Sequence, residues 1–180
     1  MPANIIERDI QVGLEMAWHG ATKVVAEVKF EDAFPFEIER LPLFVEDGQQ
    51  LEGWAYFRCS DDNKPAGVPV PDSYSAVSNA RFWEIVNNAV GGTGATIESA
   101  GTLFDRCRRF ITVKLNTEAD DFKVGDRTFK NRFSLLDSID QSTNLYGVNS
   151  STCVVCSDAA AGVAREAKTD SRVCTRDVDA

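Results

Sequence analysis

The pattern of residues 78–92 most constrains the fold, because it is helical while the segments after it have strand patterns. Apolar side chains recur at spacings of three and four, the period of one helix face, at Phe82, Ile85, Val86, Ala89 and Val90. Ser78 or Asn79 is expected to cap the first turn. Gly91 and Gly92 are expected to end the helix by adopting a left-handed conformation.

Strand patterns surround this helix. After it, strands are predicted over 95–104, 108–116, 127–138 and 143–156, and a last helix is predicted after Ser157 or Asp158. Before it, residues 36–45 and 51–60 read as strands joined at an Asp-Gly turn signal, with Pro42 indicating an edge strand or a bulge. We therefore predict an α+β fold, in which an antiparallel sheet of about four or more strands is flanked by two helices and preceded by an N-terminal β-hairpin.

The segment 61–72 is the best candidate for an internal boundary, because it contains three prolines and a glycine. The predicted parts are an acidic N-terminal segment with the hairpin, 1–72, and a unit of helix, antiparallel sheet and helix, 73–180. A chain of 180 residues suits one domain, or one domain with a small addition.

Charge is unevenly distributed along the chain. The net charge is −9, and residues 1–72 carry 14 acids against 6 bases. Residues 106–132 carry eight bases against four acids, which makes this window locally basic. Because binding responds to the local field, this window is a candidate for contact with phosphates.

Strand alternation places four of these basic side chains and one aromatic ring on a single face. Cations track phosphates and an aromatic ring can stack on a base, so a surface for single-stranded nucleic acid is one interpretation. An ordinary solvated sheet face, matched by the acidic loop 118–126, is the other. The nucleic-acid-binding candidates are Arg108, Phe110, Lys114, Lys130 and Arg132.

His19 is the only histidine and lies between Trp18 and Gly20. A catalytic histidine needs a nucleophile, an orienting carboxylate or fellow metal ligands. Glu15 could contact it if this segment were helical, but no nucleophile motif accompanies it. We expect a structural role for His19 and no enzymatic activity.

The five cysteines are odd in number and irregular in spacing, which argues against a disulfide framework. Cys153 and Cys156 have the C-x-x-C spacing of a redox or zinc pair, but the two valines between them prefer extended backbone. No second pair completes a zinc site, so we predict no metal and no cofactor. With no signal peptide and no membrane-spanning apolar run, a cytoplasmic protein is expected.

Two further motifs have a functional and a structural interpretation. Gly91, Gly92 and Gly94 follow a helix, whereas a phosphate-binding loop follows a strand, so a helix end is favoured. The segment 137–143, DSIDQST, could hold a cation or form a polar hairpin turn, and the turn is favoured.

The order of short motifs resembles one family. These motifs are WHG at 18–20, YSAVSN at 74–79, SAGTLFDRCRRFITVKL at 99–115, DSIDQST at 137–143 and VVC at 154–156. Together they are similar to the phage/plasmid-like protein family, domain of unknown function 932. The resemblance implies a mobile-element protein acting in DNA metabolism or recombination, and it carries no catalytic residues over to this chain.

Two functions remain open at this point. The first is a non-enzymatic phage or plasmid accessory protein that binds single-stranded DNA through the 108–132 strands. The alternative is a protein–protein interaction module, such as an inhibitor or assembly factor, that contacts a partner through its acidic 1–72 region.

Overall fold

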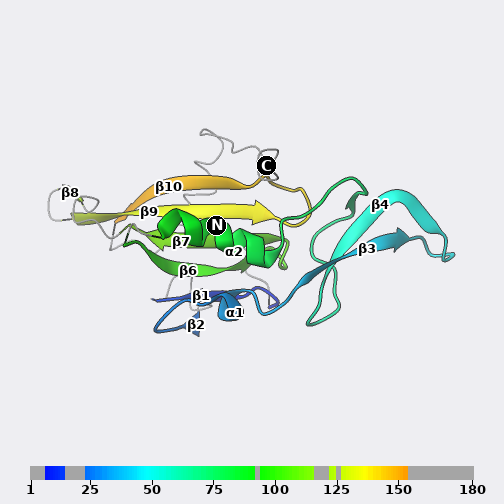
Figure 1. The fold of residues 1–180 in the computed structure, drawn as a ribbon, viewed down its shortest axis with the longest axis horizontal. Coiled ribbons are helices and arrows are strands. Elements are labelled where there is room, and N and C mark those ends of the chain that lie inside the picture. Colours follow the sequence, from blue (N-terminus) through cyan, green and yellow to red (C-terminus); the bar gives the residue numbers. More distant parts are fainter. Residues whose placement is uncertain (1–6, 15–22, 92–93, 116–121, 125–126, 154–180) are drawn as a thin grey trace.

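The computed structural model describes residues 7–14, 23–91, 94–115, 122–124 and 127–153 (Figure 1), without side-chain detail at 122–130 and 150–153. The fold is α+β, and its strands form a seven-stranded and a three-stranded sheet. The final predicted helix, the Trp18-His19-Gly20 triplet and Cys156 lie outside the described residues.

The seven-stranded sheet has the order β10-β9-β7-β6-β1-β2, with β8 paired to β9. All of its pairs are antiparallel except β1 with β2. Its strands are β1 (Gln11–Gly13), β2 (Lys23–Val24), β6 (Thr96–Leu103), β7 (Arg108–Lys114), β8 (Phe122–Val124), β9 (Arg127–Ser138) and β10 (Tyr146–Cys153). Strands β6, β7, β9 and β10 lie within the four ranges predicted after the helix.

Helix α2 (Asn79–Val90) lies across one face of this sheet (Figure 1). Ser78 caps it, since its hydroxyl oxygen accepts a hydrogen bond from the Arg81 N–H at 3.1 Å. Phe82 and Val86 are buried in the core beneath the helix, whereas Ala89 is exposed. The expected left-handed end is wrong at Gly91, whose φ is −58°; its N–H bonds to the Asn87 carbonyl.

The N-terminal segment contributes to the same core as the residues after position 72. Strand β1 pairs with β6, and Phe34, next to the short helix α1 (Phe30–Ala33), packs against Phe82. Gly101 permits this pairing, because a Cβ there would lie 1.9 Å from the Ile10 carbonyl oxygen.

The second sheet consists of β3 (Ile38–Phe44), β4 (Gln50–Cys59) and β5 (Val70–Pro71) in that order. Strand β3 is an edge strand, and its register shifts between Pro42 and Phe44. The β3–β4 pair projects from one end of the larger sheet (Figure 1). In the turn between them Gly48 has a φ of +82°, a conformation that favours glycine.

A second, smaller core joins the two sheets. It lies under the base of the β3–β4 pair and includes Ile139 from the turn that follows β9. Its buried members are Phe36, Phe57, Cys59, Ala66, Val70 and Ile139. Among the described residues, neither helix combines the length and apolarity that a membrane crossing requires.

Candidate functional site

The structure brings the two predicted basic strands side by side. Strands β7 and β9 pair antiparallel, and Lys114 lies opposite Arg132. Residues directly opposite in an antiparallel pair point to the same face, and alternation adds Arg108 to that face. The side chain of Lys130 lies outside the described part of the chain, although its backbone belongs to β9.

The positive charge on this face is reduced by an ion pair. The guanidinium of Arg132 donates two hydrogen bonds to the carboxylate of Glu98. Nη2 donates to Oε1 at 2.7 Å, and Nε donates to Oε2. These side chains are 18% and 14% exposed, so solvent screens their attraction only in part. A phosphate would have to compete with Glu98 for Arg132.

The expected stacking role of Phe110 is wrong. Its side chain is only 4% exposed, and its register partners are Gly101 in β6 and Leu136 in β9. A base needs an open ring face to stack on. Arg108 instead places its guanidinium 4.7 Å from the ring centroid of Phe104, which is 42% exposed.

A buried charged network lies on the other face of β7, beneath α2. Arg109 is fully buried and pairs with Asp137, and its Nη1 donates to Asn79 Oδ1 at 2.9 Å. Asn79 in turn donates from Nδ2 to the Phe36 carbonyl at 2.6 Å. Burial raises the pKa of Asp137, and the guanidinium of Arg109 opposes that shift. The network therefore ties α2 and the segment before β3 to the sheet.

The sequence analysis did not predict this buried network, although the sequence contains one sign of it. Alternation places Arg109 on the same face as Ile111 and Val113, which are core residues. A charged side chain in an apolar row requires a buried partner of opposite charge. Asp137 is directly opposite Arg109 in the β7–β9 register, but that register follows only from the fold.

The segment 137–143 forms the polar turn that the sequence favoured. Asp140 accepts hydrogen bonds from the Ser142 N–H at 3.0 Å and from the Val68 N–H at 3.2 Å. The second bond reaches the Pro-rich loop, where Gly67 approaches so closely that a Cβ would lie 2.4 Å from Asp140. The turn therefore anchors the loop 61–72 to the larger sheet.

Two titratable groups near this turn are held neutral. Burial, with a further contribution from Asp140, raises the pKa of Cys107 to about 12. Burial, with the nearby Asp137, raises the pKa of Tyr74 to about 12. Tyr74 donates a hydrogen bond to the Ser138 carbonyl at 3.2 Å. A thiol with so high a pKa is a poor nucleophile at neutral pH.

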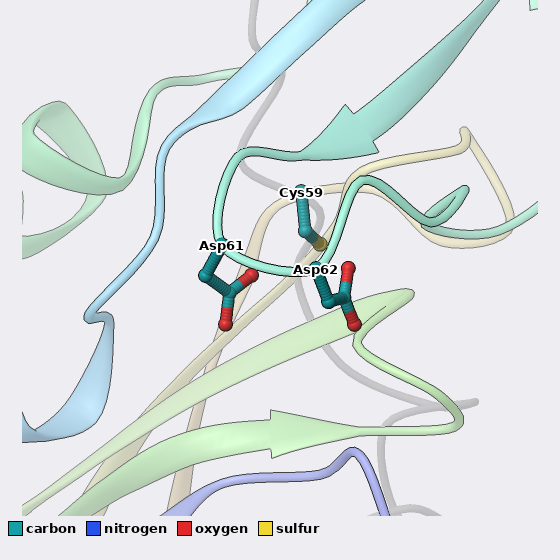
Figure 2. Close-up of side chains that lie close together, drawn as sticks. All are labelled: Cys59, Asp61 and Asp62. Carbon is teal, nitrogen blue, oxygen red and sulfur yellow. The ribbon is translucent and has the colours of Figure 1, made fainter.

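One group of possible metal ligands occurs among the described residues: Cys59, Asp61 and Asp62, whose ligand atoms lie within 4.8 Å of one another (Figure 2). Both carboxylates already have cationic partners. Asp61 Oδ1 lies 2.6 Å from Arg106 Nη1, and Asp62 Oδ2 lies 2.8 Å from Arg8 Nε.

The electrostatics of these three side chains favour ion pairs with arginine over the binding of a metal ion. Burial raises the pKa of the Cys59 thiol, and metal binding requires the thiolate. Burial alone would raise the pKa of Asp62, but the hydrogen bonds from Arg8 and the Lys64 N–H outweigh it and lower that pKa. The group therefore serves as a junction that holds the end of β4 against the larger sheet.

The same junction holds a strained turn between β6 and β7. Phe104, Asp105 and Arg106 all have φ values near the left-handed region, at 57°, 61° and 66°. Such a conformation costs non-glycine residues free energy and persists where neighbours impose it. Here Arg106 donates from its N–H to Asp9 at 2.9 Å and from Nε to the Arg8 carbonyl at 2.7 Å.

Three residues of the motifs that carry the family resemblance make contacts between elements of the fold. Asn79 ends YSAVSN and bonds to Arg109, Gly101 of SAG receives β1, and Asp140 of DSIDQST bonds to the Pro-rich loop. Within the described residues, these motif positions perform structural tasks that hold the two sheets and α2 together.

A different surface is exposed and apolar. It lies on the β3–β4 hairpin and its turn, and we call it the hairpin surface. Its side chains are Phe44, Val45, Leu51 and Trp54, which are 56%, 44%, 39% and 44% exposed. Acidic side chains accompany them at Glu46, Asp47 and Glu52.

Comparison with known proteins leaves the chain without an assigned relative. No family model matches it, no curated protein is similar to it, and no solved structure matches its fold.

Proposed function

We propose that this chain is a non-catalytic protein–protein interaction module, an inhibitor or assembly factor, that binds a partner through the hairpin surface. Its setting in this proposal is cytoplasmic, in a phage, plasmid or related mobile element, as the resemblance to the phage/plasmid-like family implies. The exposure of four large apolar side chains on one projecting hairpin carries this proposal.

The area of these side chains has an energetic consequence. Burying a large apolar side chain completely is worth about 1.5–3 kcal/mol. Each of the four side chains is roughly half exposed, so a partner that covers it would gain about 1 kcal/mol, and about 4 kcal/mol in all. Several exposed large apolar side chains on one projecting element are typical of interaction sites in soluble proteins.

The acidic character of the N-terminal region supports the same proposal. Residues 1–72 carry most of the net negative charge, and the hairpin belongs to them. The titratable groups buried elsewhere, such as Arg109 and Asp137, are engaged in contacts that hold the fold together.

Site-specific photocrosslinking tests the proposal. A photoreactive amino acid replaces Phe44 in one variant and the exposed Asn88 of α2 in a matched control, in cells that carry the natural system. We expect position 44 to yield a discrete protein adduct that position 88 does not. The purified adduct protein should then bind the parent chain, and W54A should weaken that binding.

Equal crosslinking at positions 44 and 88, or an adduct protein that fails to bind the parent chain, would contradict the proposal. The second candidate would then gain support. This is binding of single-stranded DNA through the face formed by β7 and β9, and its basis is that the register aligns Lys114 with Arg132.

A salt titration tests the second candidate. Arg132 is engaged by Glu98, so the prediction is made for the other three candidate cations, Arg108, Lys114 and Lys130. At about −0.7 per phosphate neutralised, they imply a slope of log affinity against log salt of roughly −2. A variant with all three replaced by serine should lose this binding, and equal binding by both chains would exclude the face.

A further inference from the structure

We propose that the partner of the hairpin surface presents an apolar patch bordered by lysine and arginine side chains. This inference rests on the proposed function and names the chemistry of the protein that the hairpin recognises. It follows from the charge, the shape and the rigidity of the hairpin.

Three apolar side chains of the two strands lie on the outer side of the hairpin. Trp54 and Tyr56 are two residues apart on β4, and alternation puts them on the side opposite the buried Ala55 and Phe57. Leu41 lies directly opposite Tyr56 on β3 and shares that side. Phe44, Val45 and Leu51 add exposed apolar side chains near the turn, and alternation along β3 puts Phe44 on the side of the hairpin opposite Leu41.

The border of this surface is acidic, and its carboxylates have no basic partner among the residues that the structure describes. Residues 44–54 contain Glu46, Asp47 and Glu52 and no lysine or arginine. The ion pairs found among the described residues involve none of these three carboxylates.

The arginines of this sheet are already committed to other carboxylates. Arg58 Nη2 lies 2.5 Å from Glu39 Oε2, and Arg40 pairs with Asp72. They therefore leave the three acids of the border uncompensated. An apolar centre with an acidic border is complementary to an apolar patch with a basic border, since opposite potentials attract across an interface.

The turn is held in one shape before any partner arrives. The Val45 N–H donates to the Gln49 carbonyl at 3.0 Å, and the Gly48 N–H donates to the Val45 carbonyl at 2.9 Å. Asp47 accepts from the Gln49 N–H at 2.9 Å. A rigid loop loses less conformational entropy on binding, so the surface is suited to specific recognition.

Other occupants fit this surface less well. A second copy of the chain would bring two acidic hairpins together in a symmetric contact, where like charges repel. Nucleic acids and anionic lipid surfaces are repelled for the same reason. Addition of a partner strand to β3 is disfavoured because Pro42 lacks an N–H and the register shifts beside it.

Selection from a library of displayed random peptides tests the partner class. The parent chain is the target, and a variant carrying F44S and W54S is the counter-target that removes peptides bound elsewhere. We expect hairpin-dependent peptides that combine apolar residues with lysine or arginine. For one such synthetic peptide, W54A should raise the Kd by about 30-fold, as interface tryptophans often do.

The charge prediction is tested separately with the triple variant E46Q, D47N and E52Q. Its association rate with the same peptide should fall about tenfold at low salt, and the salt dependence of that rate should weaken. Hairpin-dependent peptides without basic residues, or an unchanged association rate, would overturn the inference and leave the proposed function intact. Recovery of no hairpin-dependent peptide would overturn both.

Discussion

Replacing Asn79 by alanine should destabilise the protein strongly, because this one side chain connects three parts of the fold. Asn79 is fully buried, accepts from Arg109 at 2.9 Å and donates to the Phe36 carbonyl at 2.6 Å. Alanine removes both bonds and leaves a buried guanidinium N–H and a buried carbonyl without partners.

The magnitude follows from these two bonds. A hydrogen bond to a charged group is worth about 1.5–3 kcal/mol, and an unsatisfied buried carbonyl costs about 1–3 kcal/mol. We therefore expect N79A to lower the free energy of unfolding by about 3–5 kcal/mol. For a chain of this length, each kcal/mol shifts the Tm by about 2–4 °C, so the Tm should fall by roughly 6–20 °C.

Urea unfolding of the parent chain, N79A and N88A measures this difference. Asn88 is an exposed asparagine in the same helix, so N88A controls for helix propensity and should change stability by less than about 0.5 kcal/mol. If N79A and N88A unfold with the same free energy, the buried network contributes nothing and the reasoning is refuted.

Three further changes test other parts of the fold. G101A should destabilise the protein and separate β1 from β6, because the added Cβ would lie 1.9 Å from the Ile10 carbonyl oxygen, and hydrogen exchange of the β1 amides measures this. F82A should cost about 3–5 kcal/mol in urea unfolding, because Phe82 is fully buried beneath α2. D62N should reduce the loss of stability in acid. The pKa of Asp62 is lower in the folded chain than in the unfolded chain, so the stabilisation from its carboxylate is present above about pH 4 and is lost as the pH falls further. Thermal unfolding from pH 6 to pH 2 measures this loss in both chains.

Each of these variants has a matched control. G53A adds a Cβ that meets nothing within 4 Å, so its cost comes from the φ of +79° alone and should be smaller than that of G101A. F44A removes a ring that is 56% exposed, so equal costs for F44A and F82A would show that the helix stripe was misassigned. D47N removes a carboxylate from the exposed turn, and an acid profile identical to that of D62N would contradict the ion pair between Asp62 and Arg8.

Local pattern predicted the main elements because their signals lie within short windows. The stripe at Phe82 and Val86, the cap at Ser78 and the alternation over 108–114 depend on residues a few positions apart. The short strands β1, β2, β5 and β8 were not predicted, since two or three residues give no period. Strand β1 exists because Gly101 lets a distant segment approach β6.

In the candidate site, too, local pattern predicted some features and contacts between distant strands decided the others. Alternation correctly grouped Arg108 and Lys114, but burial of Phe110 depends on its neighbours in β6 and β9. The pairing of Arg132 with Glu98 spans three strands, and no spacing in the sequence encodes it. The sequence also could not predict that the hairpin surface is exposed, because the same pattern of apolar residues occurs in strands that are buried by other elements.

The sequence by itself determined the class of the fold, the positions of the long strands and of α2, and the concentration of acidic charge before residue 72. These follow from periodicity and composition, which act over a few residues or over the whole chain. Only the tertiary structure decided that Arg109 meets Asp137 and Asn79, that Asp62 meets Arg8, and that Trp54 lies exposed beside uncompensated carboxylates. Burial and ion pairing depend on which distant strands become neighbours, and that choice is made by packing of the whole chain.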